Sequence, residues 1–312
     1  MDRLLHELVG LWPLLALGGA LYWLGLVAFT TWLITHPPRR TYSWAVARGL
    51  PGDPGELDDP LSFEELEPAT SFGPVRAWRI TGARADGPVV ILSPGWSDSR
   101  VGALTRVGAY ASGASAVVAW DPPGLGESGG WCSLGAREGR MLAELARELC
   151  AGRPVVLAGW SLGAGASLDA AVRLESEQQV EVAGVVAEVP YRHVQTPASA
   201  VMRMQRMPWR LNLWPALWVV GLLGGIGARW RGFDRAGLAS RLRCPLLVLH
   251  GTLDPVSPFE DGQAIADAAP DSELVVTEEG SHNDLWVDEE FRPVQERAVT
   301  RFLQRLGKAT SG

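Results

Sequence analysis

The sequence is poor in lysine and in cysteine. Lys308 is the only lysine among 28 basic residues, and we attribute this excess of arginine to base composition. The cysteines are three in number and form no Cys-x-x-Cys pair, so neither a disulfide framework nor a zinc site is indicated. We expect them to be packing residues in a reducing compartment: Cys132, Cys150 and Cys244. The net charge of −7 argues against nonspecific binding to nucleic acid.

The composition instead favours a large folded domain. The chain has 312 residues, of which 47% are hydrophobic and 20% are charged. This length accommodates one α/β domain of about 250 residues together with an additional segment. The hydrophobic fraction supplies a large core, so most of the chain is not expected to be disordered.

The longest uncharged run lies near the N-terminus and covers residues 8–35. It contains 28 residues, whereas roughly 20 helical residues cross a hydrocarbon core of about 30 Å. A cleaved signal peptide is the alternative, but its hydrophobic region is only about 7–15 residues long. We therefore predict a membrane anchor over residues 1–36, which makes the lipid bilayer a partner of this chain.

Arginines flank this span unequally. One precedes it and three follow it closely: Arg3, and then Arg39, Arg40 and Arg48. Because positive charge accumulates on the cytoplasmic side of a membrane, this asymmetry predicts a single-pass protein of the cell membrane with a cytoplasmic main domain.

The chain after the span begins with a linker and continues as an α/β domain. Residues 37–61 are rich in turn-forming proline and glycine and are predicted to be the linker. Continuous apolar runs then alternate with helical patterns, which predicts a mostly parallel sheet with helices on both faces. Strands are expected near 63–68, 75–81, 89–93, 116–120, 154–159, 182–188, 245–251 and 273–277, and helices near 100–112, 135–150, from 161, near 258–268 and near 290–306.

A Gly-x-Ser-x-Gly motif around Ser161 directly follows one of these strands. A serine hydroxyl is a weak nucleophile, and it must be held at a sharp turn beside a base and N–H donors. Gly159 and Gly163 allow the tight turn and the close packing of the next helix. A second copy of the motif surrounds Ser128, but two prolines separate it from its strand. We therefore predict that Ser161 is the nucleophile.

Position in the chain selects a base and an acid for Ser161. Of five histidines, His282 lies in a loop between the last strand and the last helix, whereas His250 ends a strand and is expected to be packed. Asp254 lies just past the carboxyl end of a strand, where catalytic groups of parallel sheets gather. Asp284 is the alternative acid, but it is only two residues from His282. The order Ser161, Asp254, His282 predicts a Ser-His-Asp catalytic triad.

An oxyanion hole requires two backbone N–H groups. The N–H of Leu162 follows the nucleophile at a helix N-terminus and is expected to supply one. The other is expected after the first long parallel strand, where we select the N–H of Trp96; a simple tight turn is the alternative for this stretch. Neither a cofactor nor a metal ion is expected.

These motifs resemble those of the α/β-hydrolases over about residues 62–306. The stretch from Asp121 to Ser128 is similar to the D-x-x-G-x-G-x-S loop that these proteins carry after their fourth strand. The resemblance implies an α/β-hydrolase fold with a core of residues 62–191 and 241–308.

The stretch from His282 to Trp286 resembles the His-Asn-Asp-Thr-Trp signature of one subgroup. These are the bud-emergence-type, membrane-anchored α/β-hydrolase-domain proteins, which also have one membrane span before the domain. The sequence departs from their pattern at Leu285, and at Ser93 and Pro94, where many relatives have a histidine.

Residues 192–240 interrupt the strand–helix alternation where these hydrolases insert a cap. The uncharged run 211–227 is short, and it is broken by proline and glycine, so it is a poor second membrane span. We expect an apolar lid that lies on the bilayer, with flanking arginines toward anionic headgroups: Arg203, Arg206, Arg210, Arg229, Arg231 and Arg235.

The sequence as a whole predicts a membrane-anchored serine hydrolase. It would cleave an acyl ester of a small molecule, either a lipid or another apolar acyl substrate, through an acyl-enzyme. The alternatives are a non-catalytic, membrane-tethered binding module on the same fold, or a serine peptidase or thioesterase. Residues 124–129 also spell the Gly-x-Gly-x-x-Gly of dinucleotide-binding proteins, but their strand is not the first of the sheet and prolines intervene.

Overall fold

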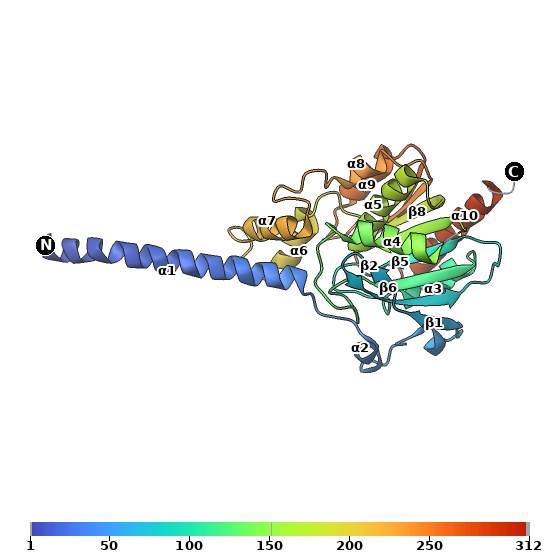
Figure 1. Cartoon of the computed structure of the whole chain (residues 1–312), viewed down its shortest axis with the longest axis horizontal. Coiled ribbons are helices and arrows are strands. Elements are labelled where there is room, and N and C mark those ends of the chain that lie inside the picture. Colours follow the sequence, from blue (N-terminus) through green and yellow to red (C-terminus); the bar gives the residue numbers. More distant parts are fainter. Residues whose placement is uncertain (1, 151, 310–312) are drawn as a thin grey trace.

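An eight-stranded sheet forms the centre of the domain (Figure 1). The computed structural model describes residues 2–150 and 152–309, with the side chains of residues 11–150 and 152–307. Its strands are β1 (Phe63–Leu66), β2 (Ala69–Thr70), β3 (Gly73–Pro74), β4 (Arg76–Thr81), β5 (Val89–Ser93), β6 (Ala116–Asp121), β7 (Val155–Trp160), β8 (Val182–Glu188), β9 (Leu246–Gly251) and β10 (Ser272–Thr277). The main sheet has the order β1-β4-β6-β5-β7-β8-β9-β10, and β2 and β3 form a separate hairpin. β4 is antiparallel to both of its neighbours and the remaining pairs are parallel, which confirms the predicted sheet.

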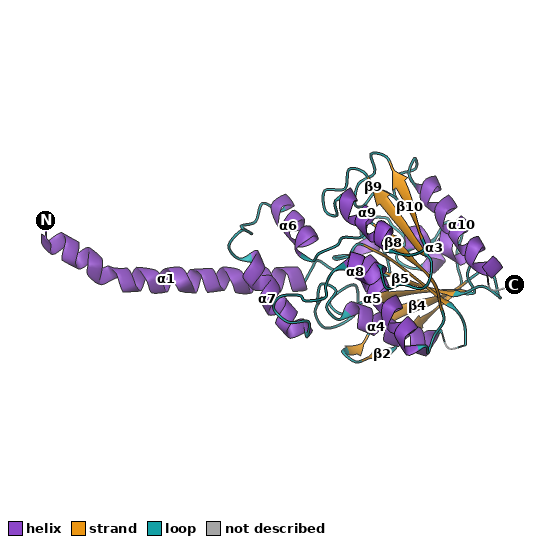
Figure 2. Cartoon of the chain, turned by 90° about the horizontal axis from the view of Figure 1, so that it is seen from above, coloured by secondary structure: helices purple, strands orange, loops and turns teal. Residues whose placement is uncertain are grey.

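Helices cover both faces of the sheet (Figure 2). One face carries α3 (Leu104–Ala111) and α10 (Arg292–Ala309), and the other carries α4 (Glu138–Leu149), α5 (Leu162–Glu177), α8 (Arg235–Ala239) and α9 (Phe259–Ala268). Successive strand residues point to opposite faces. In β5, Val89 and Ile91 join the core under α4 and α5, whereas Val90 and Leu92 join the core under α3 and α10. Burial on both faces explains the continuous apolar strands.

The N-terminal helix α1 (Asp2–Thr35) projects from the domain (Figure 1). Its segment Leu11–Thr35 has 25 residues and a mean hydropathy of 1.7, and it is long and apolar enough to cross a membrane. Most of this segment is exposed. The membrane orientation was predicted partly from Arg3, and the side chain of Arg3 lies outside the described residues.

Of the two helices in the predicted cap, α7 (Leu213–Gly224) lies along the C-terminal part of α1, and α6 (Gln195–Met204) packs against α7 (Figures 1 and 2). The indole N–H of Trp23 donates to the carbonyl of Leu211 at 3.0 Å, and the amide of Asn212 donates to the hydroxyl of Thr30 at 2.5 Å. A hydrophobic cluster separate from the two sheet cores joins α1, the cap and the loop after β6. By contrast, α8 packs against α5 and α9 of the core.

The segment 37–61, predicted as a linker, is packed onto the core. It contains α2 (Tyr42–Val46) and a short 3-10 helix, η1 (Pro54–Glu56). Ala45 is fully buried, and Trp44 and Leu57 pack against the core under α3 and α10. Its prolines and glycines therefore lie in a chain segment that follows the surface of the domain.

Candidate active site

Ser161 occupies a strained turn between β7 and α5. Its backbone φ is 52° and its ψ is −110°, a conformation that residues with a side chain rarely adopt. A Cβ on Gly163 would lie 1.9 Å from the carbonyl oxygen of Ser93, and a Cβ on Gly159 would lie 2.5 Å from the carbonyl carbon of Gly163. The two glycines of the motif thus let α5 start directly against the ends of β5 and β7.

Two loops at the same edge of the sheet bring His282 and Asp254 to Ser161. The Nε2 atom of His282 lies 3.0 Å from Oγ of Ser161, and its Nδ1 atom lies 2.7 Å from Oδ2 of Asp254. The side chain of Asp254 has no exposed surface, and its Oδ1 atom accepts the N–H groups of Val256 and Ser257, each at 2.8 Å. Because both carboxylate oxygens have partners, the direction in which Asp254 faces the imidazole is fixed.

The residues considered as alternatives have other partners. The hydroxyl of Ser128 donates to a backbone carbonyl at 2.6 Å and accepts a backbone N–H at 2.8 Å. Asp284 accepts the N–H of Ser281 at 2.7 Å. His250 is fully buried, with its ring against Phe259. None of these contacts involves the hydroxyl of Ser161 or the ring of His282.

The glycine-rich loop after β6 encloses the carboxylate of Asp121. That carboxylate accepts the N–H groups of Arg100 and Glu127 at 2.7 and 2.9 Å, and a Cβ on Gly126 would lie 2.2 Å from it. Burial raises the pKa of Asp121 to about 6. Since the loop's N–H groups face a carboxylate of the protein itself, the loop does not fit the cradle of a dinucleotide phosphate.

Trp96 and Leu162, whose N–H groups are predicted to form the oxyanion hole, line the same pocket as the nucleophile. Leu162 is the first residue of α5. A Cβ on Gly95 would lie 3.4 Å from Cβ of Ser161, so the loop after β5 runs beside the serine side chain. Within the described part of the chain, neither N–H donates to a protein acceptor. Both can therefore donate to an oxygen of a bound molecule.

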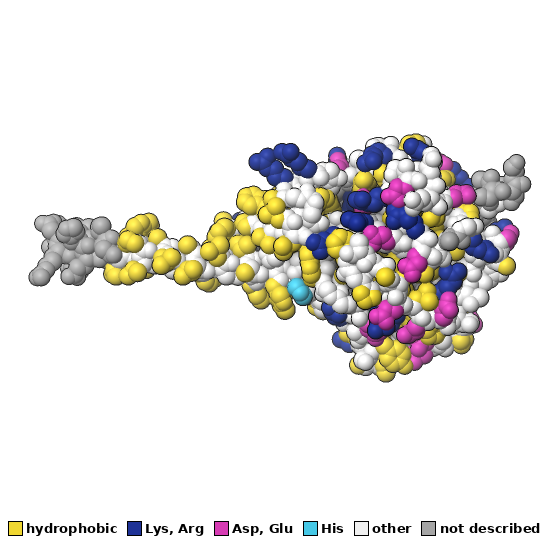
Figure 3. Space-filling view, in the orientation of Figure 1, with side chains coloured by type: hydrophobic (Ala, Val, Ile, Leu, Met, Phe, Trp, Pro, Cys, Tyr) yellow, Lys and Arg dark blue, Asp and Glu magenta, His cyan; other side chains and the backbone are white. Residues whose placement is uncertain are grey.

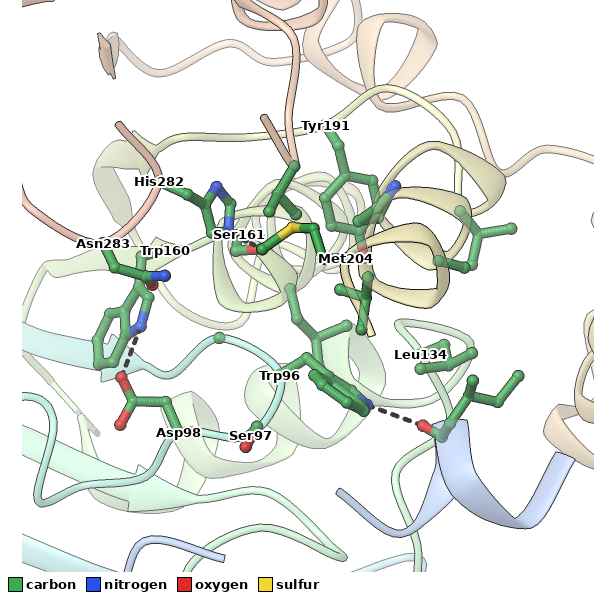
Figure 4. A pocket seen from close by; sticks show the side chains of 18 of the residues that line it. Trp96, Ser97, Asp98, Leu134, Trp160, Ser161, Tyr191, Met204, His282 and Asn283 are labelled. Carbon is green, nitrogen blue, oxygen red and sulfur yellow. Dashed lines mark hydrogen bonds between the residues drawn. The ribbon is translucent and has the colours of Figure 1, made fainter. Parts of the chain in front are cut away.

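A cavity of about 260 Å³ opens at Ser161, and its two sides differ in polarity (Figure 4). Ser161 and His282 lie between these sides. The apolar side comes mainly from α6 and the loop after β6, and includes Leu134, Val194, Pro197, Ala198, Val201 and Met204. The polar side carries Arg40, Ser97, Asp98 and Asn283.

The first 40 residues also contribute to this cavity, which was not predicted from the sequence. Ile34, from the end of α1, and Arg40 both line it. A guanidinium nitrogen of Arg40 lies 3.2 Å from Oδ1 of Asp98. Burial raises the pKa of Asp98, and the charge of Arg40 opposes this rise. The apolar face of α6 could have been found from helical spacing at 194, 197, 198 and 201, whereas no local signal indicates that Ile34 returns to the site.

One arginine of the cap region does not face solvent. Arg235 is 2% exposed, and its guanidinium lies 4.0 Å from the ring centroid of Phe233. The expectation that Arg235 faces lipid headgroups is therefore wrong. The other five arginines that were expected to face headgroups are exposed: Arg203, Arg206, Arg210, Arg229 and Arg231.

Metal-ligating side chains are dispersed. Among residues 2–150 and 152–309, no group of three His, Cys, Asp or Glu side chains could hold a metal ion. The cysteines are buried and form no disulfide: Cys132, Cys150 and Cys244.

The arrangement of strands and helices is similar to that of solved α/β-hydrolases. An esterase from Pyrococcus furiosus aligns with a TM-score of 0.64 over 88% of this chain and 98% of its own, with 20% identity. A thermophilic esterase from Thermogutta terrifontis aligns with a TM-score of 0.55 over 78% and 99%, with 20% identity. An α/β-hydrolase from a Penicillium species aligns with a TM-score of 0.56 over 78% and 99%, with 16% identity.

Sequence comparison alone gives no assignment, since no family profile and no curated protein matches the chain. At the identities of the structural neighbours, the similarity establishes the fold. The chain has the α/β-hydrolase fold, with an apolar helix before it.

Proposed function

We propose that the protein is a serine hydrolase that cleaves an acyl ester through an acyl-enzyme. The hydrogen-bonded series Asp254–His282–Ser161 carries this proposal, because it offers an oriented base to a hydroxyl on a strained turn. The esterases among the structural neighbours support the same class of reaction.

In the proposed reaction, Oγ of Ser161 attacks the acyl carbonyl while His282 takes its proton. The N–H groups of Trp96 and Leu162 donate to the oxyanion, and His282 then protonates the leaving alcohol as the C–O bond breaks. A water molecule, deprotonated by His282, attacks the acyl-enzyme, and Ser161 recovers its proton as the carboxylic acid leaves. Asp254 holds Nδ1–H and stabilises the imidazolium in both halves.

The lining of the cavity supports an apolar acyl group. The face that α6 turns toward Ser161 carries aliphatic side chains, and Ile34 of α1 extends that surface. Such a surface gains free energy by burying a hydrocarbon chain. The polar side near Ser97 and Asn283 suits the oxygen-containing leaving group.

We also propose that the protein is attached to a membrane by α1. Its apolar segment of 25 residues is about 38 Å long at 1.5 Å per residue, which exceeds a hydrocarbon thickness of about 30 Å. The 12 residues of α7 span about 18 Å, which is too short to cross. Figure 3 shows hydrophobic side chains along α1 and over the cap beside it. Those exposed around α7 are Leu211, Trp214, Trp218, Val219, Leu222 and Leu223.

Membrane attachment and orientation can be measured on the full chain. It should remain in the membrane fraction in alkaline carbonate, and protease should digest the domain only in opened cells, since the arginines after the span favour a cytoplasmic domain. Digestion in intact cells would reverse the orientation. A mature N-terminus after residue 36 would indicate a signal peptide instead.

The position of α7 can be measured with a fluorophore on Leu222→Cys. Because the described native cysteines are buried, the new thiol should be labelled selectively. In nanodiscs we expect blue-shifted emission that brominated lipids quench, whereas the same label on Ser176→Cys, an exposed position on α5, should be unaffected. Equal responses at both positions would exclude contact of α7 with the bilayer.

A fluorophosphonate probe tests the hydrolase proposal directly. It should label the wild-type chain and Ser128→Ala but not Ser161→Ala, because only Ser161 has an adjacent base. A non-catalytic binding module would not be labelled. p-Nitrophenyl esters of graded chain length should then show higher kcat/KM as the acyl chain lengthens to fill the cavity. Matched ester, thioester and anilide substrates separate the esterase from the thioesterase and peptidase alternatives.

A further inference from the structure

The loop that carries Trp96 is bound to the chain leaving α1 at three consecutive residues. Each of these residues contacts a different point of the segment 34–40. The indole N–H of Trp96 donates to the carbonyl of Ile34 at 2.8 Å (Figure 4), the hydroxyl of Ser97 donates to the carbonyl of Pro38 at 3.0 Å, and the carboxylate of Asp98 lies 3.2 Å from the guanidinium of Arg40.

The first of these contacts satisfies the end of a helix. The last carbonyls of an α-helix have no partner within the helix and need one elsewhere. In α1, the catalytic domain supplies two: Trp96 Nε1 for the carbonyl of Ile34, and the backbone N–H of Cys132, at 2.9 Å, for the carbonyl of Thr35. Ile34 is 5% exposed and belongs to the same hydrophobic cluster as Leu134 and Leu162. The end of α1 is therefore built into the domain.

The same loop is bound to the nucleophile's turn on its other side. Oδ2 of Asp98 accepts the indole N–H of Trp160 at 3.1 Å, and Trp160 directly precedes Ser161. A Cβ on Gly95 would lie 3.0 Å from the Trp160 ring, so little space separates loop and turn. The backbone N–H of Trp96 thus lies between two fixed supports, one at Trp160 and one at Ile34.

We propose that Trp96 is a positioning residue, and that the C-terminal end of α1 is a structural part of the oxyanion hole. The indole bond to the Ile34 carbonyl sets where the Trp96 N–H points relative to Ser161. On this proposal α1 affects the rate of turnover as well as the location of the protein. This inference rests on the proposed acyl-transfer reaction, because only such a reaction uses that N–H.

The test uses the full chain in nanodiscs and compares two Trp→Phe variants. Trp96→Phe removes the indole N–H but keeps an aromatic ring, and Trp131→Phe is the matched control. Trp131 packs against the same cluster as Trp96, and among the described residues its indole N–H has no acceptor. We expect a roughly tenfold fall in kcat for Trp96→Phe with KM changed less than about twofold, since small displacements of a catalytic group cost this much or more. Trp131→Phe should keep wild-type kcat.

A trifluoromethyl ketone separates positioning from general loss of structure. It forms a tetrahedral oxyanion adduct with the serine, so its affinity should fall for Trp96→Phe by the same factor as kcat/KM. Ser97→Ala, which removes the hydrogen bond to the carbonyl of Pro38, should lower the inhibitor affinity and kcat/KM by a smaller factor. Unchanged kcat and unchanged inhibition in Trp96→Phe would overturn the inference while leaving the hydrolase proposal intact. A wild-type chain that is not labelled by fluorophosphonate would overturn both.

Discussion

Replacing Asp254 by asparagine should nearly abolish turnover while preserving the fold. In the native site, Oδ1 of Asp254 accepts the N–H groups of Val256 and Ser257, and Oδ2 faces Nδ1 of His282. An asparagine has one carbonyl oxygen for these two roles. The two N–H donors require that oxygen at the Oδ1 position, so the NH2 group is directed at the imidazole.

The tautomer of His282 follows from this orientation. An NH2 donor facing Nδ1 requires that Nδ1 be unprotonated, so the imidazole proton is on Nε2. A protonated Nε2 cannot accept the hydroxyl proton of Ser161. Turning the amide over would place NH2 against two N–H groups, at a cost of about 2–6 kcal/mol for two lost hydrogen bonds. We expect kcat to fall by about 10⁴, which corresponds to about 5.5 kcal/mol in the barrier.

The assay compares kcat of Asp254→Asn and Asp284→Asn on one p-nitrophenyl ester, with thermal unfolding as the check on folding. The carboxylate of Asp284 accepts a single N–H, from Ser281. An asparagine oxygen can accept the same N–H, so kcat of Asp284→Asn should stay within about threefold. A fall of less than tenfold for Asp254→Asn, or an equal fall for both variants, would refute the assignment of the acid.

Three further predictions concern the pair Ser161 and His282, the buried Asp121, and the turn residue Gly163. Ser161→Ala and His282→Ala should each lower kcat by several orders of magnitude and the double variant by little more; multiplied losses would contradict a shared step. The pKa of Asp121 is about 6 in the fold against an ordinary 3.8, so its contribution to stability is full below pH 3.8 and is lost as the pH rises through 6. The difference in unfolding free energy between wild type and Asp121→Asn, measured in urea, should therefore change by about 3 kcal/mol across this pH range; parallel pH profiles of the two proteins would refute it. Gly163→Ala should lower both Tm and kcat, because its Cβ would overlap a carbonyl at 1.9 Å, whereas Gly108→Ala in α3 meets no atom within 4 Å and should keep both. Equal behaviour of the two glycines would contradict this packing argument.

The sheet was predictable because its strands are buried on both faces. The runs 89–93 and 182–188 coincide with β5 and β8, since a strand covered by helices needs uninterrupted apolar residues. Signals for short elements are weaker. The β2–β3 hairpin has two residues in each strand, which is too few for a periodic pattern, and α3 begins at Leu104 rather than at 100 because turns occupy the preceding residues.

The stretch from His282 to Trp286 can reflect either membership of a subgroup or the packing of its own loop. Leu285 and Trp286 are buried, and the indole of Trp286 donates to Glu188 at 2.7 Å, while Asp284 holds the loop at Ser281. These residues are therefore explained by the packing of the loop that presents the histidine. The subgroup resemblance that rests on them stays a prediction.

The docking of the cap along α1 could not be predicted from an uncharged run, which specifies length but not which face of the helix is covered. This docking sets the depth of the domain if α1 spans a bilayer as proposed. Among the side chains of α1 that the structure describes, Trp23 makes the first polar contact with the cap. Residues 8–22 extend about 22 Å, which is less than the hydrocarbon thickness of about 30 Å. A complete span must then include the helical turns against which the cap already packs.

Part of the cap therefore lies at the margin of the hydrocarbon region in the proposed orientation. The pairing of the buried Asn212 amide with Thr30 fits this depth, because an unpaired amide in an apolar medium is costly. Ile34, on the wall of the cavity at Ser161, is the second-last residue of the apolar segment Leu11–Thr35 that is proposed to cross the membrane. With that segment across the bilayer, the cavity would lie at the boundary between the hydrocarbon region and the headgroups. The proposed span and the cavity are therefore coupled, because the last turn of α1 is part of both.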